Sequence, residues 1–176
     1  MPRYFLDTSA LAKLYRSEAG SAFVDRIFSE PASQHLISRL TIVEMESVFA
    51  LKARTGQIDQ QAVLIARRRL EADLGRSRLL VAAVNDDHFR SATRLLIKHG
   101  ATEAFRTLDA LQLSIALGLK RAGLVTVFVA ADQKTLPSGR TRRVRGDESR
   151  TATFSHDLRF VFPWSLKAST PSPHSS

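Results

Sequence analysis

The chain has 176 residues, of which 44% are hydrophobic and 24% charged, a composition ordinary for one globular domain with a sizeable core. It contains no cysteine, which excludes disulfides, thiolate metal sites and a cysteine nucleophile. Lysine and arginine total 26 against 17 acidic residues, and the net charge of +9 favours polyanionic partners such as RNA or DNA. The same excess also aids solubility, so charge alone does not decide.

The N-terminus carries no secretory signal, because an acid follows at Asp7, too early for an apolar signal core. The longest uncharged apolar runs, 111–119 and 122–131, are too short to span a bilayer. We therefore expect a cytoplasmic protein without a membrane segment.

In chain order, the first half reads as short apolar strands separated by amphipathic helices. The expected elements are a strand at 3–6, a helix at 9–18, a helix capped by Ser21 and ended by Pro31, a strand at 35–38 and a helix from Thr41 to about Arg54.

The second half continues this alternation. A long helix is predicted from Asp59 past Leu70, followed by a strand at 79–84, a helix capped by Asp86 or Asp87 and running through His99, a helix from Thr107 to Gly123 and a strand at 124–130. Alternating strands and helices predict an α/β fold with a mostly parallel central sheet flanked by helices. We expect one domain at 1–136 and an atypical basic, Ser/Pro-rich extension at 137–176, with a strand near 159–162.

The most informative feature is a set of carboxylates placed where strands end or helices begin: Asp7, Glu44, Asp109 and Asp132. Parallel strands deliver such positions to one crevice at their carboxyl ends. Carboxylates that share a crevice repel one another, so they either take up protons or hold a hard divalent cation. The joint pattern therefore indicates a metal site, and metal in a basic protein points to phosphate chemistry.

Each acid also has a purely structural interpretation. Asp7 and Asp132 follow strands and could cap turns, and Asp109 stands in the first turn of a helix, where an acid is favoured. Thr41-Ile-Val-Glu44 reads as a capping box, in which Glu44 returns to the backbone of Thr41. Glu46 is a further candidate that points elsewhere from Glu44.

Other chemistries fit less well. The histidines have no metal-binding spacing, and there is neither a glycine-rich phosphate loop nor a Gly-x-Ser-x-Gly elbow. Three consecutive arginines, Arg67, Arg68 and Arg69, could contact RNA, although such a run is more often a solvated helix face.

The motifs as a set resemble those of the PIN-domain family, and most closely its VapC branch, the toxins of bacterial toxin–antitoxin pairs. The resemblance spans about residues 3–136. It rests on Tyr4-Phe-Leu-Asp7-Thr-Ser-Ala-Leu-Ala-Lys-Leu-Tyr15, Ser38-Arg-Leu-Thr-Ile-Val-Glu44, Thr107-Leu-Asp109-Ala-Leu-Gln-Leu and Phe128-Val-Ala-Ala-Asp132-Gln-Lys.

This resemblance implies a PIN-like three-layer fold and a metal-dependent endoribonuclease that leaves a 5′-phosphate and a 3′-hydroxyl. It implies that Asp7, Glu44, Asp109 and Asp132 bind Mg²⁺ or Mn²⁺, and we expect Asp7 and Asp109 to be the closest ligands. Thr8 and Ser9 match hydroxyls that support the acidic cluster, or they cap the first helix. The resemblance further implies an RNA substrate, a homodimer and a cognate antitoxin that covers the active site.

Several alternatives stay open at this stage. The chain departs from the family after Asp132-Gln-Lys, where Pro137-Ser-Gly interrupts the expected last helix, which puts stability and dimerisation in question more than the acidic site. A PIN nuclease in RNA processing without a toxin role and a non-catalytic RNA-binding module are the main competitors. A phosphotransferase or a receiver domain is disfavoured, because Ser9 stands where the former needs an aspartate and no acidic pair lies beside Asp7.

Overall fold

The computed structural model describes residues 1–101, 106–130 and 160–161, the last two by their backbone alone. Five strands form one sheet with the order β3-β2-β1-β4-β5. They are β1 (Arg3–Leu6), β2 (Gln34–Ser38), β3 (Leu80–Ala82), β4 (Val127–Val129) and β5 (Phe160–Val161). The first four run parallel, whereas β5 runs antiparallel to β4. The predicted α/β class with a mostly parallel sheet is therefore confirmed.

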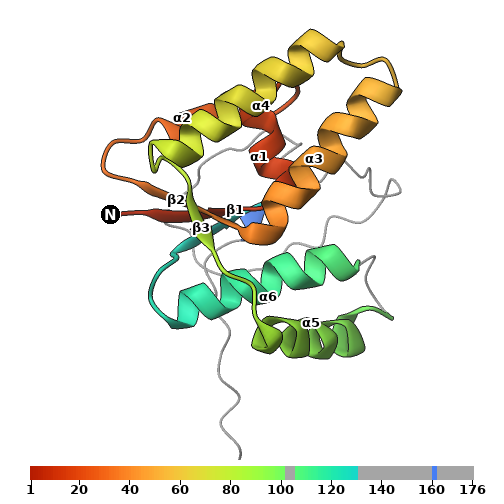
Figure 1. The fold of residues 1–176 in the computed structure, drawn as a ribbon. Helices are drawn as coiled ribbons and strands as arrows, with labels where there is room; N and C mark the ends of the chain where they lie inside the picture. Colours follow the sequence, from red (N-terminus) through yellow and green to blue (C-terminus); the bar gives the residue numbers. More distant parts are fainter. Residues whose placement is uncertain (102–105, 131–159, 162–176) are drawn as a thin grey trace, which may run out of the picture.

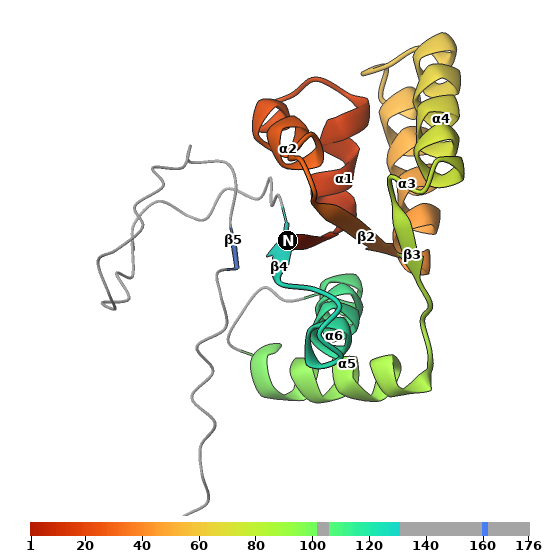
Figure 2. The same ribbon diagram turned by 90° about the vertical axis from the view of Figure 1, so that its left-hand side faces the viewer.

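Helices cover both faces of the sheet (Figures 1 and 2). One face carries α1 (Thr8–Tyr15), α2 (Ser21–Phe28), α3 (Arg39–Arg54) and α4 (Gln60–Gly75), and the other carries α5 (Asp86–His99) and α6 (Thr107–Arg121). In the part of the chain that the structure describes, no helix is long and apolar enough to cross a membrane.

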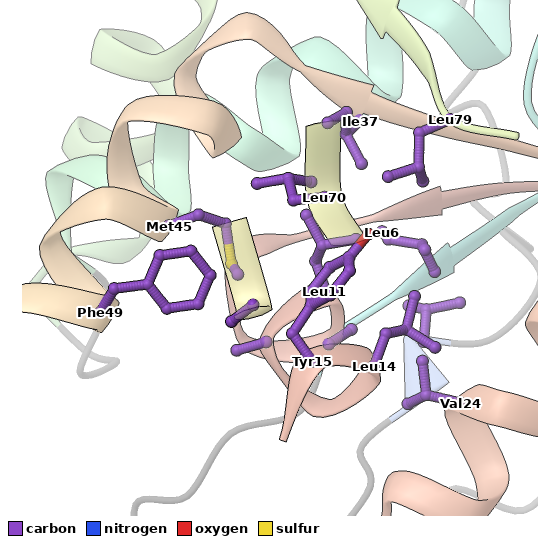
Figure 3. Close-up of a cluster of buried hydrophobic side chains, with 14 of the residues drawn as sticks. Leu6, Leu11, Leu14, Tyr15, Val24, Ile37, Met45, Phe49, Leu70 and Leu79 are labelled. Carbon is purple, nitrogen blue, oxygen red and sulfur yellow. The ribbon is translucent and has the colours of Figure 1, made fainter. Parts of the chain in front are cut away.

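The three layers follow from the alternation of side chains along the strands. Leu6, Ile37 and Val129 join the apolar cluster beneath α1 to α4, much of which Figure 3 shows. Their preceding neighbours, Phe5, Leu36 and Phe128, join the cluster that includes Ile115 of α6. Phe5 lies beside both Leu36 and Phe128 in the strand register, so the central strand β1 anchors both cores.

Several helix starts differ from the sequence prediction. Helix α1 begins at Thr8, one residue before Ser9, and α5 is capped by Asn85, not by Asp86 or Asp87. Helix α3 begins at Arg39, not at Thr41, because the Ser38 hydroxyl caps it by accepting a hydrogen bond from the Thr41 amide at 3.0 Å. Helix α2 is preceded by Gly20 at φ 86°, a left-handed conformation that glycine adopts without strain. Ser21 is the first helical residue, and its hydroxyl instead donates to the carbonyls of Lys13 and Arg16.

The predicted domain boundary at residue 136 and most of the 137–176 extension lie outside the described residues. Within that extension, β5 falls where a strand was expected, and Phe160 pairs with Val129 and Val161 with Phe128.

Candidate active site

Asp7 lies at the carboxyl end of the central strand and begins the first helix. Its amide donates to the Val129 carbonyl at 3.0 Å, which extends the pairing of β1 with β4 by one residue. Its carboxylate caps α1, with Oδ1 accepting from the Ala10 amide at 2.8 Å and from the Ser9 hydroxyl at 2.7 Å. The structural interpretation of Asp7 as a helix cap is thus realised, but it uses only one carboxylate oxygen.

Glu44 is brought to the same region by α3, which starts directly at the end of the neighbouring strand β2. Because Ser38 caps this helix, Glu44 does not return to the backbone of Thr41, and the predicted capping box is wrong. Instead, Glu44 Oε2 accepts from the Thr8 hydroxyl at 2.6 Å and from Gln112 Nε2 at 2.5 Å. Glu44 is thereby tied to both α1 and α6.

Asp109 stands in the first turn of α6, on the opposite face of the sheet from α3. Its Oδ2 accepts from the Arg106 amide at 3.1 Å, which satisfies one of the orphan amides at the start of the helix. The carboxylate is otherwise exposed to solvent.

The three acids share one arrangement, in which a single oxygen serves the protein framework. Among the described residues, the second oxygens, Asp7 Oδ2, Glu44 Oε1 and Asp109 Oδ1, have no hydrogen-bond partner. Each acid therefore keeps one oxygen for a ligand. Within the same residues, no group of three or more acidic or histidine side chains lies close enough together to enclose a metal ion.

The electrostatics of Asp7 show that the acids influence one another. The pKa of Asp7 is raised from 3.8 to about 6, first because burial disfavours its charged form. The Ala10 amide and the Ser9 hydroxyl oppose this shift, and the negative charges of Glu44 and Asp109 add to it. Asp7 thus carries an unfavourable charge at neutral pH, which a cation would relieve.

Gln112 is a site residue that the sequence analysis missed. It is 4% exposed and reaches Glu44, Thr41 and Ser38 through its amide. Its signal in the sequence was weak: a polar residue three positions after Asp109 lies on the same helix face as that acid, but it stands inside an otherwise apolar run.

The other predicted site residues are placed as follows. Asp132 lies outside the described residues. Glu46 forms an ion pair with Arg67 on the surface, and this contact does not link either residue to the three acids. Arg69 donates to the Leu14 carbonyl and lies over the Tyr15 ring, a structural role. Arg68 is exposed and makes no hydrogen bond or ion pair with other described residues.

Together, the fold and the site define a three-layer α/β protein with an acidic site at the carboxyl ends of its parallel strands. The family model for the PIN domain matches residues 4–134. The chain therefore belongs to the PIN domain family. A comparison with curated protein sequences found no match.

Solved structures with the same fold include the toxin VapC20 from Mycobacterium tuberculosis, which cleaves the sarcin–ricin loop. It is 22% identical, with a TM-score of 0.53 over 74% of this chain and 90% of that one. PAE2754 from Pyrobaculum aerophilum is 26% identical, with a TM-score of 0.51 over 75% and 76% of the two chains. VapBC2 from Rickettsia felis, solved with promoter DNA, is 14% identical, with a TM-score of 0.44 over 70% and 95%.

Proposed function

We propose that this protein is a metal-dependent endoribonuclease that acts as the VapC-like toxin of a toxin–antitoxin pair. The observation that carries the proposal is the set Asp7, Glu44 and Asp109, each with one carboxylate oxygen held by the framework and one left over. Membership of the PIN domain family and the net charge of +9 support a nuclease that acts on RNA.

The residues present suit Mg²⁺ or Mn²⁺ chemically. Carboxylate oxygens are the ligands that these hard cations prefer, and the pKa of Asp7 is raised first by burial and further by the negative charges of Glu44 and Asp109. Magnesium keeps several waters and is usually held by only one or two carboxylates directly. This agrees with acids that influence one another without forming a closed cluster. Asp7 and Asp109 would be the direct ligands, and Glu44 and Asp132 would act partly through water.

The chain's own residues would divide the work as follows. A bound cation supplies an activated water and neutralises charge on the phosphate. Asp7 and Asp109 hold the cation through the oxygens that they do not use for capping. Glu44 would offer Oε1 to the site, because Thr8 and Gln112 hold Oε2. Ser9 keeps the Asp7 carboxylate oriented through its hydrogen bond to Oδ1.

The proposed partners follow from the same argument. RNA is the substrate, a cognate antitoxin covers the acidic site, and two copies form a homodimer. Arg68 is the member of the arginine run that remains available for phosphate contacts, since Arg67 and Arg69 are engaged by Glu46 and by Leu14.

The test is a cleavage assay on total bacterial RNA with Mg²⁺, with Mn²⁺ or with EDTA, comparing the full chain with Asp7→Asn and Asp59→Asn. The two aspartates are matched, because Asp59 caps α4 through the Ala62 amide at 2.7 Å just as Asp7 caps α1. Asparagine caps helices as well as aspartate does, so both variants should fold.

Discrete fragments that require metal, persist in Asp59→Asn and vanish in Asp7→Asn are the expected result. RNA that stays intact under every condition but still binds the folded protein without metal would instead favour a non-catalytic RNA-binding module. Cleavage without any growth arrest on expression would favour an RNA-processing nuclease.

A further inference from the structure

A buried ring of hydrogen bonds lies beside Glu44, formed by Ser38, Thr41 and Gln112. Ser38 and Thr41 are fully buried and Gln112 is 4% exposed. The ring joins the end of β2 and the first turn of α3, which are consecutive, to α6, which is distant along the chain.

With Gln112 Oε1 facing Ser38 and Nε2 facing Thr41, the donors and acceptors of this ring follow in one direction. The Ser38 hydroxyl donates to Gln112 Oε1 at 2.9 Å, so its oxygen must accept from Thr41 Oγ1, which lies 3.0 Å away. The Thr41 oxygen in turn accepts from Gln112 Nε2 at 3.0 Å. All three bonds therefore run in the same direction around the ring, and each donor is matched to an acceptor.

The Glu44 carboxylate fixes which end of the Gln112 amide faces it, because an ionised carboxylate only accepts hydrogen bonds. One Nε2 hydrogen closes the ring on Thr41, so the second is available for Glu44 Oε2 at 2.5 Å. A flipped amide would only reverse the direction of the ring, but it would turn the amide oxygen toward the Glu44 carboxylate, which cannot donate a hydrogen bond. The Thr8 hydroxyl donates to the same Glu44 oxygen at 2.6 Å, so two donors occupy Oε2 and Oε1 is left over.

We propose that Gln112 is a positioning residue, which holds Glu44 in the orientation that presents only Oε1 to the cation and substrate. The inference rests on the proposed function. Gln112 itself acts through Glu44, because its amide is fully used by Ser38, Thr41 and Glu44, with a longer contact of 3.4 Å to the Thr8 hydroxyl. Partners that orient metal ligands in this way commonly contribute about 10- to 100-fold to metal affinity or activity.

The first variant is Gln112→Met, which keeps much of the side-chain volume and removes both donors and the acceptor. Mn²⁺ binding to the full chain is measured by calorimetry, and cleavage of a defined RNA gives kcat and KM. We expect Mn²⁺ to bind about 10-fold more weakly and kcat to fall by a similar factor, while KM changes less than about 2-fold.

The matched control is Ser114→Ala on the same helix. Ser114 is fully buried and donates to the carbonyls of His88 and Leu111, away from Glu44. The Ser114→Ala variant therefore also loses buried hydrogen bonds. We expect its Mn²⁺ affinity and kcat to stay within about 2-fold of the wild-type values.

A double-variant cycle separates positioning from general loosening of the site. In a Glu44→Gln background, Gln112→Met should cause less than about a 2-fold further change in Mn²⁺ affinity, because the group through which it acts is already altered. Should Gln112→Met fail to fold, Thr8→Val removes the other donor to Oε2, and the same loss and the same dependence on Glu44 are expected.

If the wild type binds Mn²⁺ and folded Gln112→Met binds it equally well, this inference is overturned and the proposed function stands. If Gln112→Met does not fold, the same result with Thr8→Val has the same meaning. Equal losses with and without Glu44→Gln would also overturn it. A wild-type protein that neither binds Mn²⁺ nor cleaves RNA would overturn both.

Discussion

Asp7 and Asp109 are related by a shared local role, since each gives one carboxylate oxygen to a backbone amide at the start of a helix. Asp7 accepts from the Ala10 amide at 2.8 Å, and Asp109 accepts from the Arg106 amide at 3.1 Å. Helix starts expose several amides that need such partners and favour negative charge nearby. Capping therefore brings these acids to the carboxyl ends of the strands and leaves each of them one oxygen.

The first prediction concerns Asp109→Asn. The amide oxygen of asparagine can still accept from the Arg106 amide, so the melting temperature should change by only a few degrees. Loss of the charge at the proposed site should lower the rate of metal-dependent RNA cleavage at least about 100-fold, because the cation that Asp109 would hold takes part in the reaction. Cleavage rate and thermal unfolding are measured on the same preparation.

The control for Asp109→Asn is Asp87→Asn, which alters the corresponding first-turn acid of α5. Asp87 forms an ion pair with Arg90 on the surface at 2.6 Å and is not part of the proposed acidic site. It should cleave RNA at the wild-type rate. Comparable loss in both variants would argue that first-turn charge, not a ligand, is what matters at Asp109.

A second prediction follows from the pKa of Asp7, raised from 3.8 to about 6 in the metal-free fold. The folded state then binds a proton more tightly than the unfolded chain, so ionised Asp7 costs stability above about pH 6 and this cost is relieved as the pH falls. Relative to Asp7→Asn, the wild type should gain about 1 kcal/mol in free energy of unfolding between pH 7 and pH 5.

Denaturant titrations of both proteins in EDTA at several pH values test this. Protons and metal compete for the same carboxylate, so Mn²⁺ affinity should also decline as the pH drops below about 6. A difference between the two proteins that stays flat from pH 7 to pH 5 would contradict the raised pKa.

A third prediction concerns the core beneath α1 to α4. Ile37 is fully buried in the centre of β2, whereas Ile97 on α5 is 79% exposed. Replacing Ile37 with alanine leaves a cavity and should lower the free energy of unfolding by about 2 to 5 kcal/mol. Ile97→Ala should change it by less than about 0.5 kcal/mol, as judged by urea titration. Similar values for the two would show that the packing of this layer is loose.

A fourth prediction concerns RNA binding through the arginine run on α4. Arg68→Ala should weaken the binding of a defined RNA, and the salt dependence of the binding constant should fall by the equivalent of about one phosphate contact. Binding is measured in an Asp7→Asn background, which prevents cleavage. Arg67→Ala is the control, since Arg67 is already paired with Glu46 through two hydrogen bonds. An effect of Arg67→Ala equal to that of Arg68→Ala would remove the case for Arg68.

Much of the fold was predictable because strands and helices carry distinct spacings of apolar residues. The strand at residues 3–6 was placed correctly, and Asp59 was placed within one residue of the start of α4, where it is the N-cap. The start of α3 was missed because Ser38 and Thr41 are both good capping residues, and only the observed bond from the Thr41 amide to the Ser38 hydroxyl distinguishes them. That difference of a few residues turned Glu44 from a predicted cap partner into a side chain held by Thr8 and Gln112.

The site was predictable in part for a related reason. An acid after a strand or in the first turn of a helix is visible in the sequence, so Asp7 and Asp109 could be named. The contacts of Gln112 could not, because they join residues 68 to 74 positions apart, and no local pattern encodes them. Its burial against polar partners depends on the tertiary structure, which brings α6 to the end of β2 and the first turn of α3.

The division of labour between the two oxygens of Asp7 has a genetic consequence. Aspartate and asparagine codons differ only at the first base, so a single G-to-A transition is enough to replace Asp7 with asparagine. Since the helix cap needs only an acceptor oxygen, that exchange would leave a folded chain with an unchanged outline but without the charge. Under the proposed toxin function, a bacterial population that expresses this protein would thus reach inactive but well-folded alleles in one mutational step.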